Sequence, residues 1–153
     1  GFKAVAEQII DVHFGGEQIN YLSLAVRGRA YHRSVDYWDG NWLLVDVSIA
    51  VGKFTGSIPG LLRAEELHNF SVQLQGFSET LTGPISFLTV EGWLKFRLEV
   101  DKLGHIRLSG TVSDDVHSPN HLTFAFNVDQ PTLAGTLDQL RHVVETWPVV
   151  GSR

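Results

Sequence analysis

The sequence contains no cysteine. This absence excludes disulfide bonds, catalysis by a thiolate and metal sites built from thiolates, and it is compatible with a reducing compartment. The chain also lacks any apolar run that approaches the roughly 20 residues needed to cross a bilayer. Its first residues have neither the apolar stretch nor the small-residue cleavage site of a secretory signal. We therefore expect a soluble cytoplasmic protein with no membrane partner.

The composition is that of an ordinary folded domain. The 153 residues are 43% hydrophobic and 19% charged, and a domain of this length buries roughly 68 to 70% of its unfolded surface. One core is enough, so we expect a single domain over residues 1–153. The net charge of -5 disfavours nonspecific binding to nucleic acid or to an anionic membrane, and it suits a basic partner. We expect no nucleic-acid partner.

Alternating hydrophobic residues predict strands from Tyr21 onward. In residues 42–51 nearly every second side chain is apolar, which places one face of a strand in the core. Similar alternation occurs in residues 21–26, 54–58, 85–90, 93–101, 105–113 and 121–128. The connections are mostly short and contain turn residues, and strands joined in this way pair antiparallel. Residues 1–20 fit a helix about as well as a strand.

Two segments change to the spacing of an amphipathic helix. The first covers residues 63–78, and the second follows Pro131 and ends before Pro148. Their apolar stripes are Leu67, Phe70, Leu74 and Phe77 in the first, and Leu133, Leu137, Leu140 and Val144 in the second. The predicted fold is therefore α+β, with a meandering antiparallel sheet of about six or seven strands and two amphipathic helices packed on one face.

No motif specific to catalysis, nucleotide binding or metal binding is present. His117 and His121 have the spacing of a metal-binding pair on a helix, but Pro119 between them predicts a loop. The adjacent carboxylates of Asp114 and Asp115 are more typical of a turn than of an acid-base pair. Basic residues at strand positions favour a solvated face over a nucleic-acid surface, because no aromatic residues interleave with them. These basic residues are Arg27, Arg29, Lys95, Arg97 and Arg107. We expect no catalytic residue, no cofactor and no metal.

The stretch "DYWDGNWLL", residues 36–44, is the most distinctive part of the chain. Residues 39–41 are suited to a tight loop that leads into the strand at Trp42. The two tryptophans flank this loop, where they either pair across strands or lie beneath it. Tyrosine and tryptophan beside aspartate are also the composition of a protein–protein hot spot. Residue chemistry favours the structural role and leaves partner contact open. The candidate residues are Asp36, Tyr37, Trp38, Asp39 and Trp42.

The segment "DYWDGNWL" closely resembles the one that marks the WapI-family immunity proteins, which are small bacterial proteins. The similarity continues through "GSIPGLLRAEEL", "VEGWLKFRLEV", "GHIRLSGTVSDD" and "LTFAFNVDQPTLAGTLDQLRHVVETWP" and covers about residues 33–148. One departure lies at the first helix, where Arg63 and Ala64 stand in place of the expected Thr or Asp cap.

The resemblance implies a nonenzymatic protein that binds and neutralises the toxin domain of a cognate contact-dependent inhibition system, commonly a nuclease. It implies neither a substrate nor a cofactor. An inhibitor that covers a basic active site is expected to be acidic, as this chain is. The rival hypothesis is a small-ligand-binding or catalytic domain with a pocket between the sheet and the helices.

Overall fold

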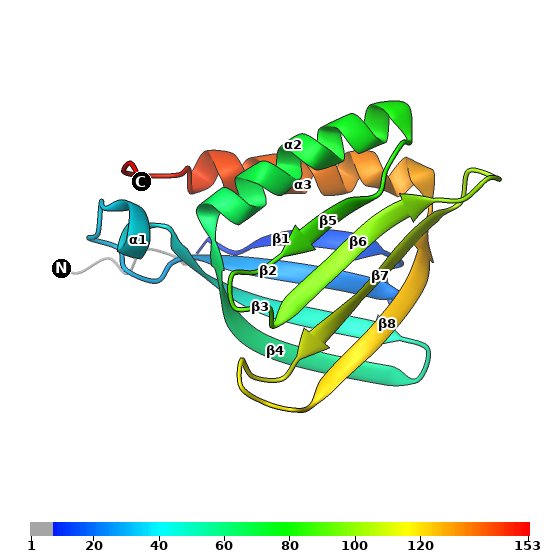
Figure 1. Cartoon of the computed structure of the whole chain (residues 1–153), viewed down its shortest axis with the longest axis horizontal. Helices are drawn as coiled ribbons and strands as arrows, with labels where there is room; N and C mark the ends of the chain where they lie inside the picture. Colours follow the sequence, from blue (N-terminus) through cyan, green and yellow to red (C-terminus); the bar gives the residue numbers. More distant parts are fainter. Residues whose placement is uncertain (1–7) are drawn as a thin grey trace.

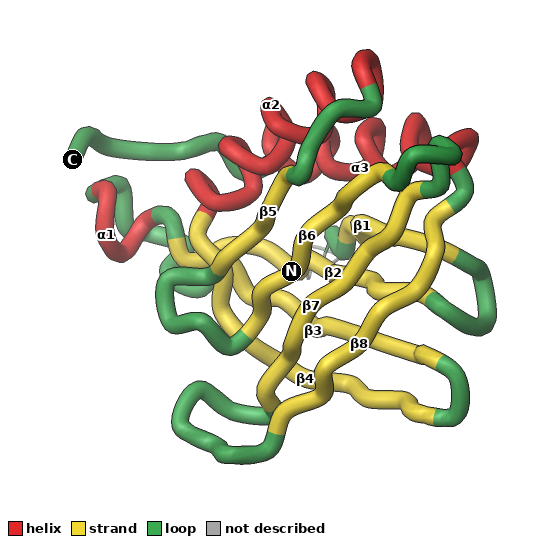
Figure 2. Tube along the Cα trace, turned by 45° about the vertical axis from the view of Figure 1, so that its right-hand side comes forward, coloured by secondary structure: helices red, strands yellow, loops and turns green. Residues whose placement is uncertain are grey.

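The computed structural model describes residues 8–153, which form two four-stranded antiparallel sheets. In both sheets the strands are ordered as they occur in the sequence. The first sheet contains β1 (Ile10–Gly15), β2 (Tyr21–Arg29), β3 (Trp42–Val51) and β4 (Phe54–Arg63). The second contains β5 (Ile85–Leu88), β6 (Leu94–Val100), β7 (Ile106–Ser113) and β8 (His121–Val128). The strands of the two sheets run at a steep angle to each other (Figure 2).

One helix connects the two sheets, and the two longer helices cover one side of them. The one-turn helix α1 (Tyr37–Gly40) lies between β2 and β3, and α2 (Ala64–Thr80) links the first sheet to the second. A short 3-10 turn, η1 (Gln130–Thr132), leads from β8 into α3 (Leu133–Thr146). The helices α2 and α3 lie side by side along the upper side of the sheets, and α1 lies at one end of the molecule (Figure 1). Among the described residues, no helix is long and apolar enough to cross a membrane.

Phenylalanine rings hold the two sheets and α2 together. The ring of Phe96 on β6 lies 5.3 Å from that of Phe14 on β1, 5.5 Å from that of Phe70 on α2 and 5.2 Å from that of Phe87 on β5. All four residues are buried. Such contacts each add roughly 0.5 to 1.5 kcal/mol beyond the burial of apolar area. The core therefore lies between the inner faces of the sheets, where α2 closes it.

A buried tryptophan joins the sheets at another point. The indole N–H of Trp93, which precedes β6, donates to the carbonyl of Leu61 on β4 at 3.2 Å. A Cβ at Gly60 would lie 2.3 Å from the Trp93 ring, so only glycine permits this approach of ring and backbone.

The α+β class and the antiparallel pairing are confirmed, but the predicted single sheet of six or seven strands with two helices is wrong in detail. Residues 8–153 form two sheets and three α-helices. Alternation shows that one face of a strand is buried, but it does not show which strands pair. The long connection through α2 ends one sheet and starts the next, and all strand pairs in the described part of the chain are antiparallel.

Several element boundaries also differ from the prediction. Residues 10–15 of the ambiguous N-terminal segment form β1, while residues 1–7 lie outside the described part of the chain. The strand expected to end at Pro59 continues to Arg63. Proline is tolerated there because β4 lies at the edge of its sheet. On α3, Val143 is fully buried, whereas the predicted Val144 is only partly buried.

Candidate functional site

The motif of residues 36–44 forms a helical turn where a tight loop was predicted. Asp36 caps the N-terminus of α1, because its carboxylate accepts the backbone N–H of Asp39 at 3.1 Å. Aspartate is among the preferred residues at this position. A Cβ at Gly40 would lie 2.8 Å from the carbonyl oxygen of Ser34 and 2.7 Å from the side chain of Val150. The turn is therefore packed tightly against the rest of the chain.

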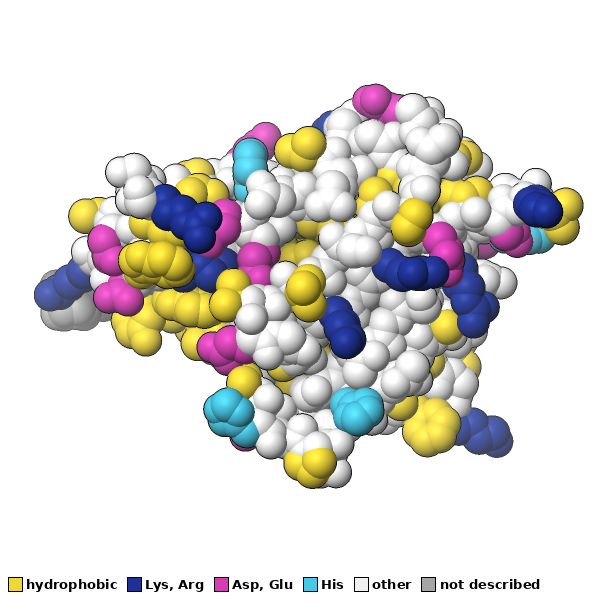
Figure 3. All heavy atoms as spheres, in the orientation of Figure 1, with side chains coloured by type: hydrophobic (Ala, Val, Ile, Leu, Met, Phe, Trp, Pro, Cys, Tyr) yellow, Lys and Arg dark blue, Asp and Glu magenta, His cyan; other side chains and the backbone are white. Residues whose placement is uncertain are grey.

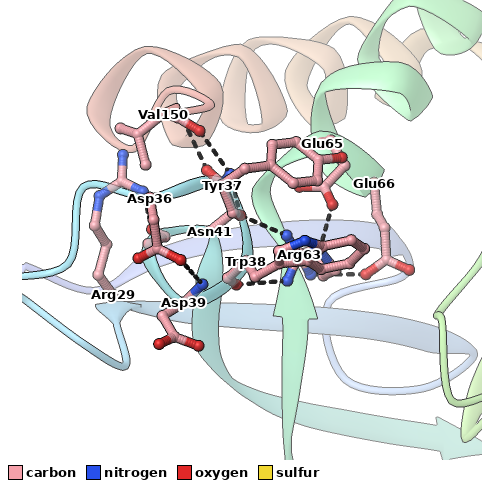
Figure 4. A network of polar contacts seen from close by, with 11 residues as sticks. Arg29, Asp36, Tyr37, Trp38, Asp39, Asn41, Arg63, Glu65, Glu66 and Val150 are labelled. Carbon is pink, nitrogen blue, oxygen red and sulfur yellow. Dashed lines mark hydrogen bonds and ion pairs between the residues drawn. The ribbon is translucent and has the colours of Figure 1, made fainter. Parts of the chain in front are cut away.

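Arg63 is the centre of this site, although it lies outside the motif (Figure 4). It is the last residue of β4, and its side chain is only 1% exposed. The guanidinium donates to the backbone carbonyls of Trp38 at 2.8 Å and Tyr37 at 2.7 Å, and it also pairs with the carboxylate of Glu65. It therefore fixes the backbone of α1 to the start of α2.

Three aromatic rings of the motif surround the same guanidinium. Its central carbon lies 4.7 Å from the centroid of the Trp42 ring, 5.1 Å from that of Trp38 and 5.2 Å from that of Tyr37. A buried cation beside such rings is stabilised by roughly 2 kcal/mol or more, which offsets part of the cost of taking the charge out of water. We call the group of Arg63, Tyr37, Trp38 and Trp42 the arginine box.

Two glutamates at the start of α2 lie beside the arginine box. Oε1 of Glu66 accepts the backbone N–H of Arg63 at 2.7 Å, which is the half of a capping box that the third helical residue supplies. The Arg63 side chain makes no cap hydrogen bond of its own. Within residues 8–153, Oε2 of Glu65 is buried without a hydrogen-bond partner. Burial raises the pKa of Glu66 to about 7, and the hydrogen bond from Arg63 acts in the opposite direction.

The other side of α1 is held by residues 148–150, which follow α3. Asn41 is fully buried, and its Nδ2 donates to the carbonyls of Tyr37 at 2.8 Å and Val150 at 2.9 Å. Its Oδ1 accepts the N–H of Val150 at 2.9 Å. The guanidinium of Arg29 donates to the carbonyls of Gly40 and Pro148. Burial lowers the pKa of Arg29. The α1 turn is therefore fixed from both sides.

The two tryptophans of the motif, Trp38 and Trp42, belong neither wholly to the core nor wholly to the surface. Trp42 and Tyr37 are partly buried, whereas Trp38 is 58% exposed although part of it packs on Arg63. The neighbouring Val35 is 79% exposed, and Asp36 and Asp39 are also exposed. Figure 3 shows hydrophobic side chains gathered over α1 with both acidic and basic side chains among them. We call the surface formed by Val35, Asp36, Trp38 and Asp39 the α1 patch.

Residues 13–148 match the family described as the Immunity protein WapI-like family. The chain belongs to this family. The match confirms the predicted resemblance and begins well before residue 33, so it includes the second half of β1 and all of β2.

Comparison with solved structures supports the fold of this WapI-like protein. It is similar to a chain of the structure titled "Crystal structures of trypanosoma bruciei MRP1/MRP2", with a TM-score of 0.50 and 10% sequence identity. The similarity covers 92% of this chain and 85% of that chain. At this identity the similarity shows a shared fold alone. No curated protein matches the chain.

The other residues considered from the sequence do not meet at one site. Within residues 8–153, no group of three or more His, Cys, Asp or Glu residues is placed to hold a metal. Arg27 and Arg29 lie on β2 of the first sheet, so they are on a different sheet from the basic residues of β6 and β7. The interpretation of the motif missed Arg63, Glu66 and Asn41. One feature of the sequence pointed to Arg63, namely its position at the start of the first predicted helix, where a Thr or Asp cap was expected.

Proposed function

We propose that this WapI-like protein is a nonenzymatic immunity protein, and that it protects the producing cell by binding and neutralising a cognate toxin domain in the cytoplasm. Membership of an immunity protein family supports a protective role in general. Binding is the simplest physical means, since an inhibitor that covers an active site needs a complementary surface and no chemistry of its own.

We propose the α1 patch as the contact surface, because Trp38 projects from a rigid support. Its backbone carbonyl is held by the buried guanidinium of Arg63, yet more than half of the residue is open to solvent. Exposed tryptophans are frequent hot spots of protein interfaces. A side chain on a fixed backbone loses little conformational freedom on binding, which favours affinity. This combination of exposure and rigidity is the observation that carries the proposal.

The charges around Trp38 fit a basic partner. Asp36 and Asp39 flank the ring in the sequence and are exposed, and the whole chain has a net charge of -5. A toxin that acts on nucleic acid carries a basic surface, and opposite charges would speed encounter with it. The expected interface therefore consists of Trp38 packed on the toxin and of aspartates facing its cations, so that association slows as salt concentration rises.

Coexpression with the toxin domain encoded beside this gene tests the proposal. The measurements are growth of the host and copurification of a complex. The wild-type protein should restore growth, and Asp39→Lys and Trp38→Ala should each weaken binding by about tenfold or more. Asp138→Lys on α3 and Phe54→Ala in the β3–β4 hairpin are matched controls, because the replaced residues are also exposed. These controls should bind as the wild type does.

Two results would contradict different parts of the proposal. If the wild-type protein neither restores growth nor forms a complex, toxin neutralisation by binding is wrong. If it does both and Asp39→Lys and Trp38→Ala bind as tightly as the wild type, the α1 patch is not the contact surface.

A further inference from the structure

A groove of about 750 Å³ lies on the outer face of the second sheet. The face is defined by strand alternation, since Phe87, Phe96 and Phe124 point into the core and their neighbours point outward. All four strands of the second sheet contribute to the groove. Its size falls within the usual range for small-molecule sites. It lies on the face opposite to the core, and not between a sheet and the helices as the rival hypothesis predicted.

The floor of the groove consists of small residues, several of which carry a hydroxyl group. Ser109 on β7 is opposite Arg97 on one side and Ala125 on the other. Ser86 and Thr123 extend this small floor on β5 and β8. Short side chains leave a hollow on a sheet face, and hydroxyl groups can donate hydrogen bonds into it.

Three cations surround Ser109. Arg97 is its direct cross-strand neighbour, Arg107 is two residues before it on β7, and Lys95 is its diagonal neighbour on β6. Strand geometry places these positions about 5 to 8 Å from Ser109. Lysine and arginine side chains are long enough to reach a common point above its hydroxyl. Basic side chains are visible over this part of the sheet in Figure 3.

Of the three cations, only Arg97 is paired within the described residues. Arg97 pairs with Glu99 at 2.8 Å, with both side chains substantially exposed. Within residues 8–153, neither Lys95 nor Arg107 makes an ion pair or a side-chain hydrogen bond. Such a concentration of positive charge contrasts with the net charge of -5 of the whole chain.

We propose that this groove binds a small phosphorylated molecule, with a phosphate group above Ser109 held by Lys95, Arg97 and Arg107. A phosphate has several acceptor oxygens and more than one negative charge, so it suits two guanidinium groups, an ammonium and a hydroxyl that converge. The organic part of the ligand occupies the rest of the groove. The site is separate from the α1 patch and does not depend on toxin neutralisation.

The same face does not suit a strand of nucleic acid. Single strands are bound by exposed aromatic rings on which bases stack. The phenylalanines of the second sheet, Phe87, Phe96, Phe124 and Phe126, are all buried. The phosphate therefore supplies most of the binding, and the nature of an attached base has little influence.

Calorimetric titration of the whole protein with pyrophosphate, ADP and adenosine tests this site. Pyrophosphate and ADP should bind within about threefold of each other, and adenosine should not bind. Lys95→Ala and Arg107→Ala should each weaken pyrophosphate binding by about tenfold. Lys53→Ala, in the β3–β4 turn, is the matched control and should leave binding unchanged. Amide NMR signals of residues 109–111 should shift on titration.

Glu99→Gln supplies a test in the opposite direction. It removes the carboxylate that pairs with Arg97, so it should tighten pyrophosphate binding severalfold, which mere loss of structure would not do. The proposal is overturned if pyrophosphate does not bind at millimolar concentration, or if Lys95→Ala and Arg107→Ala bind it as the wild type does. Binding of a short single-stranded oligonucleotide more than tenfold tighter than that of ADP would also overturn it, in favour of a polymer surface.

Discussion

Replacement of Arg63 by alanine should be among the most destabilising single changes in this protein. The guanidinium is 1% exposed and donates to two backbone carbonyls at 2.7 and 2.8 Å. Its loss would also leave Glu65 without its cationic partner and open a void between three rings. Removal of one partner from a buried ion pair typically costs about 3 to 5 kcal/mol. Because a domain is usually stable by only about 5 to 15 kcal/mol, Arg63→Ala should remove a large part of the total.

Urea denaturation followed by tryptophan fluorescence measures this effect. Trp38 and Trp42 pack on the guanidinium, so their emission reports directly on the arginine box. Arg63→Lys keeps the charge but lacks the planar fork that reaches both carbonyls, so its loss of stability should be smaller, about 1 to 3 kcal/mol. A loss below about 1 kcal/mol for Arg63→Ala, with an unchanged emission maximum, would refute the account of Arg63 as the support of α1.

Three further predictions concern the surroundings of Arg63. Trp42→Ala should lower the unfolding free energy by about 2 to 4 kcal/mol. Trp38→Ala should lower it by only about 1 to 2 kcal/mol, because Trp38 is more exposed than Trp42. Equal losses in urea titrations would contradict this reasoning. The pKa of Glu66 is raised from 4.5 to about 7 in the folded state, so its contribution to stability is present below pH 4.5 and is lost as the pH rises to 7. Glu66→Gln should flatten this part of a stability profile against pH, and an unaltered slope would count against the raised pKa. Asn41→Ala should expose the amide of Val150 to hydrogen exchange and cost about 1 to 3 kcal/mol, while unchanged protection would show that other contacts hold this segment.

The strands of this fold were predictable because a strand with one buried face has alternating apolar and polar residues in its own sequence. The apolar positions of residues 42–51 alternate in the sequence as they do in β3, and the stripe of Leu67 to Phe77 is the buried face of α2. The division into two sheets was not predictable in the same way. It depends on contacts such as Phe14 with Phe96, which join residues far apart in the sequence.

The candidate site was predictable only in part. The motif of residues 36–44 indicated the family and the aromatic cluster, and the family match confirms the first of these. The sequence did not indicate that a buried arginine would organise the rings, since arginine is almost never fully buried unless it is paired. Its carbonyl partners come from Tyr37 and Trp38, and no side-chain pattern reports on backbone carbonyls. The role of these residues as a partner surface stays a prediction.

The bond between Asn41 and Val150 has a consequence for synthesis of the protein. The two residues are 109 positions apart in the sequence. A growing chain emerges from the ribosome in order, and its early segments must wait for later ones before long-range contacts form. Arg63 follows Trp38 by only 25 positions, so one side of α1 gains its support early in translation. The other side gains it only after Val150 has been made, so a nascent chain that extends only into α3 has an α1 turn anchored on one side alone.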